Sequence, residues 1–532
     1  MNDAIMAWRA LLGDGQLDDS PGTIGRYSRS TQVEGTRPCC VLYPNSTEDV
    51  QSIVRIAARH RVVVYPISRG KNWGYGDACA PMDGAAIVDF SRMDRILEVN
   101  DELAYAVIEP GVSQGQLKSY LDAHHPDLWM DCTGAGADAS LVGNTLDRGF
   151  GHTRYGDHVL TTCGMEVVLA DGRVLNTGFG HYPNAKAARV FRYGVGPMLD
   201  GLFCQSNYGI VTKIGLWLMP RPEAFCTFFI LLDHDEDIGP LVDRLRPLRL
   251  SGVLESALHI ANDYRIFSSR VRYPFDQTGG RTPLPQEVRR RLRDSLRIGA
   301  WNVAGAFTGT RAHVRASRTA LKQALAGLGE LRFIDDRTMQ RALRVVGFAA
   351  RLGVARPLYG LLTSIQPVFA TLKGVPTEDA VRGTHWRLRN APADGVSDPL
   401  ELGAGLLWVS PVLPMLGSEA LNVMAIVEPI FAEYGFEPLA TMTMINERAM
   451  IGVMNVSFDK AVPDEAARAM QCHEALNRAL LDEGYVPYRA GLSSMPLLNG
   501  RDDTFWQIAS QIKATLDPLD IISRGRYIPP QE

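Results

Sequence analysis

The chain has 532 residues, of which 46% are hydrophobic and 21% are charged, and its formal net charge is -4. This length exceeds one ordinary hydrophobic core, so we expect two or three domains. The slightly acidic balance offers no basic surface for nucleic acid or anionic lipid. We therefore expect a small-molecule substrate, with no nucleic acid and no membrane as partner.

The cysteines and the apolar runs bear on the compartment. The eight cysteines lack the paired spacing of a zinc site or of a secreted disulfide framework, so we expect no metal site. Acidic Asp3 stands where a signal peptide is basic, and no stretch has the uninterrupted apolar length of a membrane-spanning helix. The sequence predicts a cytoplasmic protein.

The first part of the chain predicts an α/β unit followed by further strands. Apolar residues at helical spacing predict a helix over 47–61, and a buried strand follows at 62–66. Asp171-Gly172 marks a hairpin turn. Further strands are predicted at 85–90, 104–108, 166–169 and 212–218.

Near residue 222 the pattern changes to longer strands and helices, which predict an α+β domain with an antiparallel sheet. Its strands are predicted at 225–232, 303–307, 406–409, 439–444 and 451–458. Its helices are predicted at 238–248, 312–328, 419–434 and 465–483. Near the C-terminus, a last helix carries Phe505, Ile508, Ala509 and Ile512 on one face.

Three segments rich in small residues, 68–76, 134–144 and 205–211, separate these elements. Glycine-rich turns let several backbone N–H groups converge on a diphosphate. No segment has the GxGxxG or Walker pattern, which disfavours a Rossmann dehydrogenase and an NTPase. Each loop alone is equally compatible with an ordinary tight turn.

Taken in order, several strings resemble the FAD-binding domain of the vanillyl-alcohol oxidase / p-cresol methylhydroxylase family. They are residues 66–76 (PISRGKNWGYG), 97–100, 109–112, 147–149, 155–158, 164–170, 200–207, 209–215, 516–518 and 525–526. The resemblance implies an α+β fold in which a two-part FAD-binding domain, residues 1–222 and 487–532, holds an inserted antiparallel-sheet cap domain, residues 223–486.

The resemblance also implies the residues that hold FAD. The loop from Ser68 to Gly74 is expected to wrap the diphosphate, and the segments around Asn144 and Ile210 are expected to line the rest of the cofactor. The implied cofactor-binding residues are Pro66, Ser68, Arg69, Gly70, Lys71, Asn72, Gly74, Gly143, Asn144, Arg148, Gly149, Gly209, Ile210, Val211 and Arg526.

The mode of FAD attachment is where the chain departs from the family. Covalent members link the flavin through a His or Tyr shortly before the pair at 410–411, where this chain has Leu406, Leu407 and Trp408. We therefore expect non-covalent FAD. Cys132, which stands before a glycine-rich segment, is an alternative attachment point, and a buried structural thiol is the other interpretation.

The family's phenol oxidisers hold the substrate as a phenolate with two tyrosines and an arginine, which match Tyr75, Tyr488 and Arg489 here. Tyrosine O–H groups and a guanidinium favour the anion, whose ring charge drives hydride from the para carbon to the flavin. In the other interpretation, Tyr75 packs on the flavin ring while Tyr488 and Arg489 bridge the domains.

The family's acid/base aspartate is missing between Cys132 and Ala137, although Asp131 and Asp138 flank the gap. His152 stands where relatives often carry Tyr, and its imidazole can take the proton instead. A structural histidine is the other interpretation.

These residues predict an FAD-dependent oxidase or dehydrogenase acting on an alcohol, alkyl or amine carbon of a para-substituted phenol or related aromatic. O2 or a redox protein would accept the electrons. Two alternatives stay open. The first is an oxidoreductase for alcohols or 2-hydroxy acids, in which Arg489 binds a carboxylate, and the second is a flavoprotein without turnover that serves a binding role. The resemblance also implies a homodimer.

Overall fold

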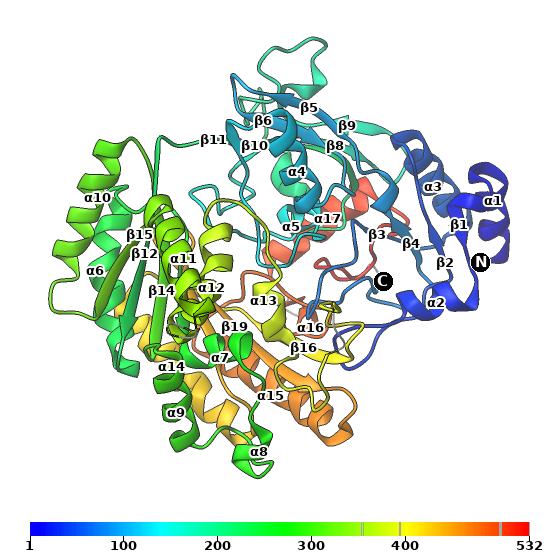
Figure 1. Ribbon diagram of the computed structural model, residues 1–532. Helices are drawn as coiled ribbons and strands as arrows, with labels where there is room; N and C mark the ends of the chain where they lie inside the picture. The colour runs from blue at the N-terminus through cyan, green and yellow to red at the C-terminus, as the bar shows by residue number, and fades with distance from the viewer. Residues whose placement is uncertain (353, 355, 393–394, 500–502, 531–532) are drawn as a thin grey trace.

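The computed structural model describes residues 1–352, 354, 356–392, 395–499 and 503–530. Its strands form four sheets, and the large sheet lies apart from the two sheets of the N-terminal part (Figure 1). No helix in the described ranges is long and apolar enough to cross a membrane.

The first sheet is built around strands parallel to β4, in the order β1-β2-β4-β3. Its strands are β1 (Leu17–Asp18), β2 (Cys40–Leu42), β3 (Val64–Ile67) and β4 (Ala86–Asp89). The helices beside it are α1 (Asn2–Leu12), α2 (Pro21–Tyr27) and α3 (Thr47–His60). The predicted helix over 47–61 is confirmed, and Ser46 caps it by accepting the N–H of Asp49 at 3.1 Å.

The second sheet is antiparallel, with the order β5-β6-β10-β8-β9. Its strands are β5 (Ile96–Asn100), β6 (Tyr105–Ile108), β8 (Thr162–Val168), β9 (Val174–Asn176) and β10 (Ile210–Trp217). A two-stranded ribbon pairs β7 (Leu128–Trp129) with β11 (Met219–Pro220). The predicted hairpin at Asp171-Gly172 is confirmed by the β8–β9 pairing.

Helices α4 (Gln114–His124), α5 (Leu141–Leu146) and α17 (Thr504–Leu516) share a hydrophobic core with this second sheet. The predicted apolar face of the last helix is only partly correct. Ala509 is buried and Ile512 packs on the core, but Phe505 and Ile508 are 70% and 49% exposed. Trp506 packs on the core instead, because tertiary contacts decide which flank of the helix is covered.

The third sheet is the large antiparallel sheet, in the order β15-β12-β14-β13-β18-β19-β16, with β17 paired to β19. Its strands are β12 (Ala224–Leu232), β13 (Leu258–Asn262), β14 (Trp301–Gly309), β15 (Glu330–Asp335), β16 (Ala404–Val409), β17 (Val412–Pro414), β18 (Leu439–Met444) and β19 (Ala449–Asp459). One face packs on four helices, α6 (Ile238–Leu250), α10 (Arg311–Ala324), α14 (Gly417–Glu433) and α15 (Pro463–Asp482). The α+β fold and the antiparallel sheet are thereby confirmed.

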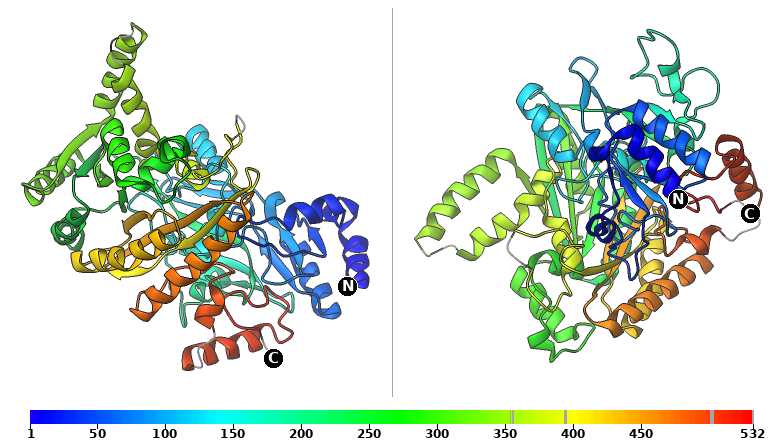
Figure 2. Two further views of the ribbon diagram at one scale, coloured as in Figure 1. Left: turned by 90° about the horizontal axis from the view of Figure 1, so that it is seen from below. Right: turned by 90° about the vertical axis from the view of Figure 1, so that its right-hand side faces the viewer.

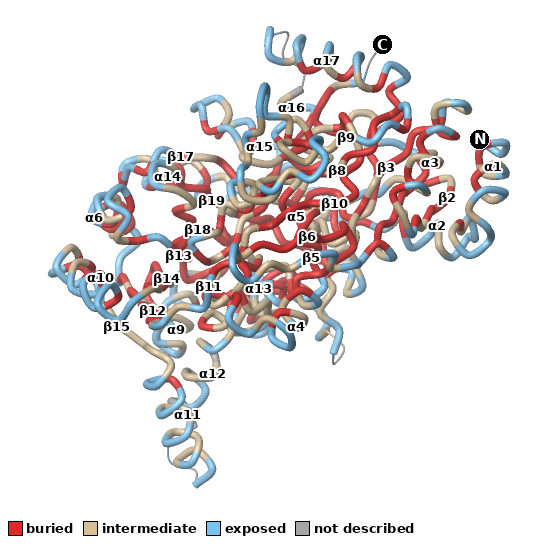
Figure 3. Tube along the Cα trace, turned by 90° about the horizontal axis from the view of Figure 1, so that it is seen from above, coloured by how far each residue is buried: buried red, intermediate tan, exposed pale blue. Residues whose placement is uncertain are grey.

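The remaining helices lie outside these layers. They are α7 (Asp263–Arg270), α8 (Phe275–Thr278), α9 (Gln286–Leu296), α11 (Asp336–Arg351), α12 (Arg356–Thr371), α13 (Asp379–Arg382) and α16 (Met495–Asn499). The α11–α12 hairpin, which the sequence analysis did not anticipate, projects from the body (Figure 2) and is largely exposed at its tip (Figure 3).

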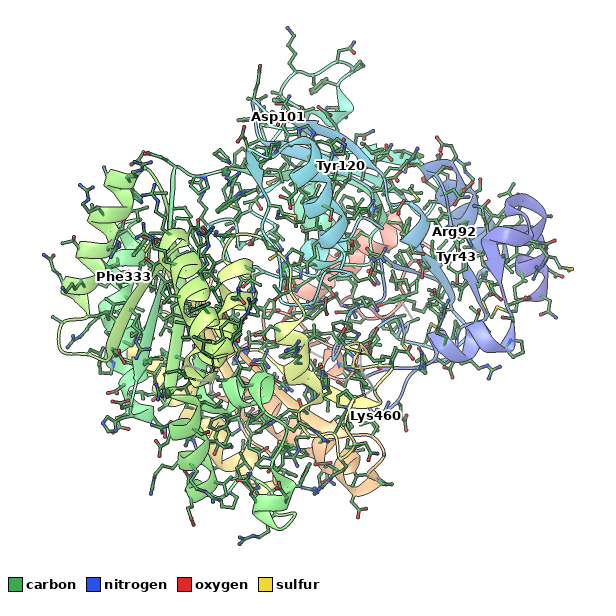
Figure 4. All side chains as sticks on the ribbon, in the orientation of Figure 1. Tyr43, Arg92, Asp101, Tyr120, Phe333 and Lys460 are labelled. Carbon is green, nitrogen blue, oxygen red and sulfur yellow. The ribbon has the colours of Figure 1, made fainter. Side chains whose placement is uncertain are left out.

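The C-terminal tail returns to the first sheet, where Ile522 bridges Val64 in parallel and Ser523 donates its N–H to the Val64 carbonyl at 2.9 Å. Lys460, labelled in Figure 4, extends from the large-sheet region and donates to the carbonyls of Ser30 and Gln32 at 2.7 and 2.8 Å. The C-terminal tail and the large-sheet region therefore both contact the N-terminal part. The domain limits 1–222, 223–486 and 487–532 stay a prediction.

Candidate functional site

A cavity of about 1070 Å³ lies between the loops of the N-terminal part, the large sheet and the C-terminal tail. Alternate residues of the large sheet face it, because successive side chains of a strand point to opposite sides. On five strands the cavity-facing pairs are Phe229 and Leu231, Asn302 and Ala304, His259 and Ala261, Thr441 and Thr443, and Leu406 and Trp408. The residue between the members of each pair belongs to the hydrophobic core; these residues are Ile230, Val303, Ile260, Met442 and Leu407.

The structure brings together nearly all residues that the sequence analysis assigned to FAD. The segments around Ser68, Gly143 and Ile210 line this one cavity, as does Arg526 of the tail. Gly74 and Arg148 do not line it. Gly74 instead donates its N–H to the Thr31 hydroxyl at 2.7 Å.

The lining fits a large anionic ligand such as FAD. Nη1 of Arg526 and Nε of Arg489 are buried, and neither atom has a hydrogen-bond partner among the described residues. A Cβ on Gly143 would lie 3.1 Å from Oγ of Ser68, so this glycine keeps the cradle between the two loops open. A guanidinium atom of Arg526 without a partner among the described residues, in a cavity lined by glycine-rich loops, suits an anionic cofactor.

Asp147 organises the cationic end of the cavity. Its Oδ2 pairs with Arg489 at 2.8 Å and with Arg526 at 2.9 Å, and Tyr527 donates its hydroxyl to Oδ1 at 3.1 Å. Burial by itself would raise the pKa of Asp147, but the two guanidinium groups outweigh it and lower the pKa to about 2. Asp147 therefore stays ionised and fixes both arginines in place.

Tyr75, Tyr488 and Arg489 meet in this cavity. The guanidinium carbon of Arg489 lies 4.2 Å from the Tyr75 ring centroid, and the Tyr75 hydroxyl lies 3.3 Å from Oγ of Ser410. Burial, followed by the nearby Tyr488, raises the pKa of Tyr75 well above its usual value. Tyr75 is therefore a neutral O–H group at neutral pH, able to donate to an anion.

His152 also lines the cavity, where its ring centroid lies 4.3 Å from that of His259. Burial lowers the pKa of His152, and burial followed by the neighbouring His152 lowers that of His259 well below the usual value. Nδ1 of His259 lies 3.2 Å from the Thr443 hydroxyl. Both imidazoles are neutral at pH 7, so His152 can accept a proton.

Neither flanking aspartate fills the missing base position. Asp131 accepts the N–H groups of His152 and Thr153 at 3.1 and 3.0 Å and pairs with His158 at 3.0 Å. Asp138 forms an ion pair with Arg69.

Cys132 is fully buried in the hydrophobic core and does not line the cavity. Its Sγ lies 3.7 Å from the Thr371 carbonyl oxygen.

Arg265 of α7 is a cavity residue that the sequence reasoning missed. Its Nη1 donates to Oδ1 of Asn455 at 2.7 Å, and its guanidinium carbon lies 5.5 Å from the Trp408 ring. Burial lowers the pKa of Arg265 to about 10. No local motif marks this residue, because its place in the cavity depends on the pairing of distant strands.

The family model described as "FAD binding domain" matches residues 38–178. The 1'-carboxy-chondrochloren decarboxylase of Chondromyces crocatus is 35% identical, over 98% of this chain and 96% of that protein. The 4-cresol dehydrogenase [hydroxylating] flavoprotein subunit of Pseudomonas putida is 31% identical, over 99% of this chain and 95% of that protein. The solved structure of 4-ethylphenol oxidase from Gulosibacter chungangensis has a TM-score of 0.89 at 28% identity and covers 100% of this chain and 97% of its own.

Proposed function

The chain belongs to the vanillyl-alcohol oxidase / p-cresol methylhydroxylase family of FAD-linked oxidoreductases, and from that premise we propose that it oxidises the side chain of a para-substituted phenol. Two relatives are named for 4-cresol and 4-ethylphenol, both para-substituted phenols. The Chondromyces crocatus relative is named as the decarboxylase of a carboxylated compound, which supports a substrate that is larger than a simple alkylphenol.

One observation carries the proposal, namely that Tyr75, Tyr488 and Arg489 converge in the cavity. A phenolic oxygen placed among them receives O–H donors and the charge of a guanidinium, which favours the phenolate. Asp147 holds Arg489 from the opposite side, so the guanidinium is already oriented when the substrate arrives. The negative charge of the ring then weakens a C–H bond of the side-chain carbon attached at the para position, so that this carbon can release a hydride.

FAD would be held by the Ser68–Asn72 loop, by Gly143 and Asn144, by Ile210 and Val211, and by Arg526. When bound, it supplies the two-electron acceptor for the oxidation. The burial of Cys132 away from the cavity, and the Leu406 and Trp408 side chains inside it, support non-covalent binding.

Within the proposal, His152 takes the proton that the substrate or an attacking water releases. Its neutral imidazole and its place in the cavity support this role. O2 or a redox protein as electron acceptor, the homodimer and the cytoplasmic location stay predictions.

The test is anaerobic titration of the purified flavoprotein with 4-ethylphenol and, separately, with D-lactate. We expect the phenol to bleach the visible absorbance of the flavin and the 2-hydroxy acid to leave it unchanged. Bleaching by the hydroxy acid alone would favour the 2-hydroxy acid alternative. No bleaching by any phenol or hydroxy acid would favour the binding role.

A further inference from the structure

Arg265 stands out among the cations of the cavity. Among the described residues, every other lining lysine or arginine either pairs with a carboxylate or, like Arg297, is exposed to solvent. The paired ones are Arg69 with Asp138, Lys71 with Asp398, Arg270 with Asp379, Arg332 with Glu330, and Arg489 and Arg526 with Asp147. Arg265 forms no ion pair within the described ranges.

The surroundings of Arg265 make the lack of an ion pair unfavourable for the free energy of folding. Its protein contacts in the cavity are the neutral amide of Asn455 and the indole of Trp408. The nearby imidazoles of His152 and His259 are neutral at pH 7, and no carboxylate of the described residues pairs with the guanidinium. A buried charge without a partner destabilises a protein, and a ligand that brings the opposite charge recovers that free energy on binding.

The guanidinium is also held in one orientation. Trp408 and Asn455 are directly opposed across the β16–β19 pair, so both side chains lie on the same face of the sheet. Asn455, which is fully buried, donates to Oγ of Ser457 at 2.5 Å and thereby presents its carbonyl oxygen to Arg265. A guanidinium held by a side-chain amide and an indole keeps donors free for a planar, bidentate partner.

From these contacts we infer that Arg265 binds a carboxylate carried by the para side chain of the substrate, an inference that rests on the proposed phenol oxidation. A single guanidinium balances the single charge of a carboxylate, whereas a phosphate dianion would leave one charge unpaired. Arg489 is not an equal candidate, because the proposed function assigns its remaining donors to the phenolate oxygen.

The phenol-binding end and Arg265 are close enough to act on one small molecule. The Tyr75 ring stacks on Trp408 at a centroid distance of 6.2 Å and an interplanar angle of 15°, and Arg265 contacts the same indole. Trp408 is thus a neighbour shared by both ends. The structure assigns the substrate to 4-hydroxyphenyl compounds with a short side chain that ends in a carboxylate.

The test compares 3-(4-hydroxyphenyl)propionate with 4-propylphenol, which has the same number of side-chain carbons but no carboxylate. Both are mixed anaerobically and in excess with the flavin-loaded enzyme in a stopped-flow instrument, and the dependence of the flavin-reduction rate on substrate concentration gives each apparent Kd. In the wild type we expect the acid to bind at least about 10-fold more tightly. In Arg265→Gln this preference is lost, and in Arg265→Lys part of it returns.

Arg297→Gln is the matched control, because it removes an exposed arginine at the same cavity and should keep the wild-type preference. Thermal unfolding of ligand-free Arg265→Gln should begin no lower than that of the wild type, since the variant loses a partly buried charge that has no ion-pair partner among the described residues. Equal affinity for the two compounds in the wild type, or an unchanged preference in Arg265→Gln, would overturn the inference. Failure of both compounds to perturb the flavin would overturn the proposed function instead.

Discussion

Arg489 covers the face of the Tyr75 ring, with its guanidinium carbon 4.2 Å from the ring centroid. The two residues are separated by most of the chain, so only the return of the C-terminal tail brings them together. The cation–π contact and the ion pair with Asp147 leave the guanidinium little freedom. A phenolate bound here meets a preorganised donor set, which is the basis of the first prediction.

Replacing Tyr75 by Phe removes one O–H donor to the phenolate. A hydrogen bond to a charged group contributes about 1.5–3 kcal/mol, so kcat/KM for 4-ethylphenol should fall about 10- to 100-fold. Tyr208→Phe is the control, because its hydroxyl donates to the Ala509 carbonyl at 2.9 Å and does not line the cavity. Equal kinetics of the two variants would remove Tyr75 from phenol binding.

Gly143 keeps the proposed FAD cradle open, so Gly143→Ala should weaken FAD binding by at least about 10-fold, since the new Cβ would meet Oγ of Ser68 at 3.1 Å. The measurement is the FAD Kd by quenching of flavin fluorescence on apoprotein. Gly201→Ala serves as the control because a Cβ there meets nothing within 4 Å. Unaltered affinity in Gly143→Ala would place the diphosphate elsewhere.

His152 is proposed to accept a proton, which requires its neutral form. Because burial lowers its pKa, kcat/KM should stay high as the pH falls to 6.5 and decline only below that value. His152→Asn should lower kcat about 100-fold or more and abolish this acid limb. His313→Asn, which changes an exposed histidine of α10, should retain the wild-type profile. An acid limb that survives in His152→Asn would belong to another group.

His473 of α15 lies under Trp408, with Nε2 3.1 Å from the Trp408 carbonyl oxygen. Burial lowers its pKa to about 4 from the ordinary 6.5. Between pH 6.5 and pH 4, His473 is protonated in the unfolded chain but not in the folded chain. The folded state therefore loses stability as the pH falls from 6.5 to 4, and this residue causes no further loss below pH 4. The full effect is about 3 kcal/mol.

In His473→Gln the side chain can still donate to that carbonyl but does not titrate. Denaturant unfolding at pH 7 and pH 4.5 should show a smaller loss of stability for this variant than for the wild type. His313→Gln is again the exposed control. Parallel losses in all three proteins would assign the acid sensitivity to other groups.

The flavin should be released on denaturation. Acid precipitation of the holoprotein should leave a yellow supernatant, and Cys132→Ser should behave in the same way, because that thiol is buried away from the cavity. A yellow pellet in the wild type would indicate a covalent link, and its loss in Cys132→Ser would identify the attachment point.

Much of the architecture could be predicted because it depends on local patterns. The helix α3 follows from apolar residues at helical spacing behind a Ser46 cap, and the strands β12, β14, β16, β18 and β19 of the large sheet were predicted, whereas β13, β15 and β17 were missed. The α11–α12 hairpin was missed, and Phe505 and Ile508 were assigned to the wrong environment. In both cases the exposure of the helix depends on whether segments far away in the chain pack against it.

The candidate site, too, follows partly from local sequence and partly from tertiary structure. The order and residue types of the glycine-rich loops, together with Tyr75, Tyr488 and Arg489, determined the family and the chemistry it implies. Only the tertiary structure decided that Asp147 pairs with Arg489 while Arg265 has no carboxylate partner in the described part of the chain, and that Cys132 lies away from the cavity. Which charges meet depends on strand register and on the return of the tail, and neither is encoded in a short stretch of sequence.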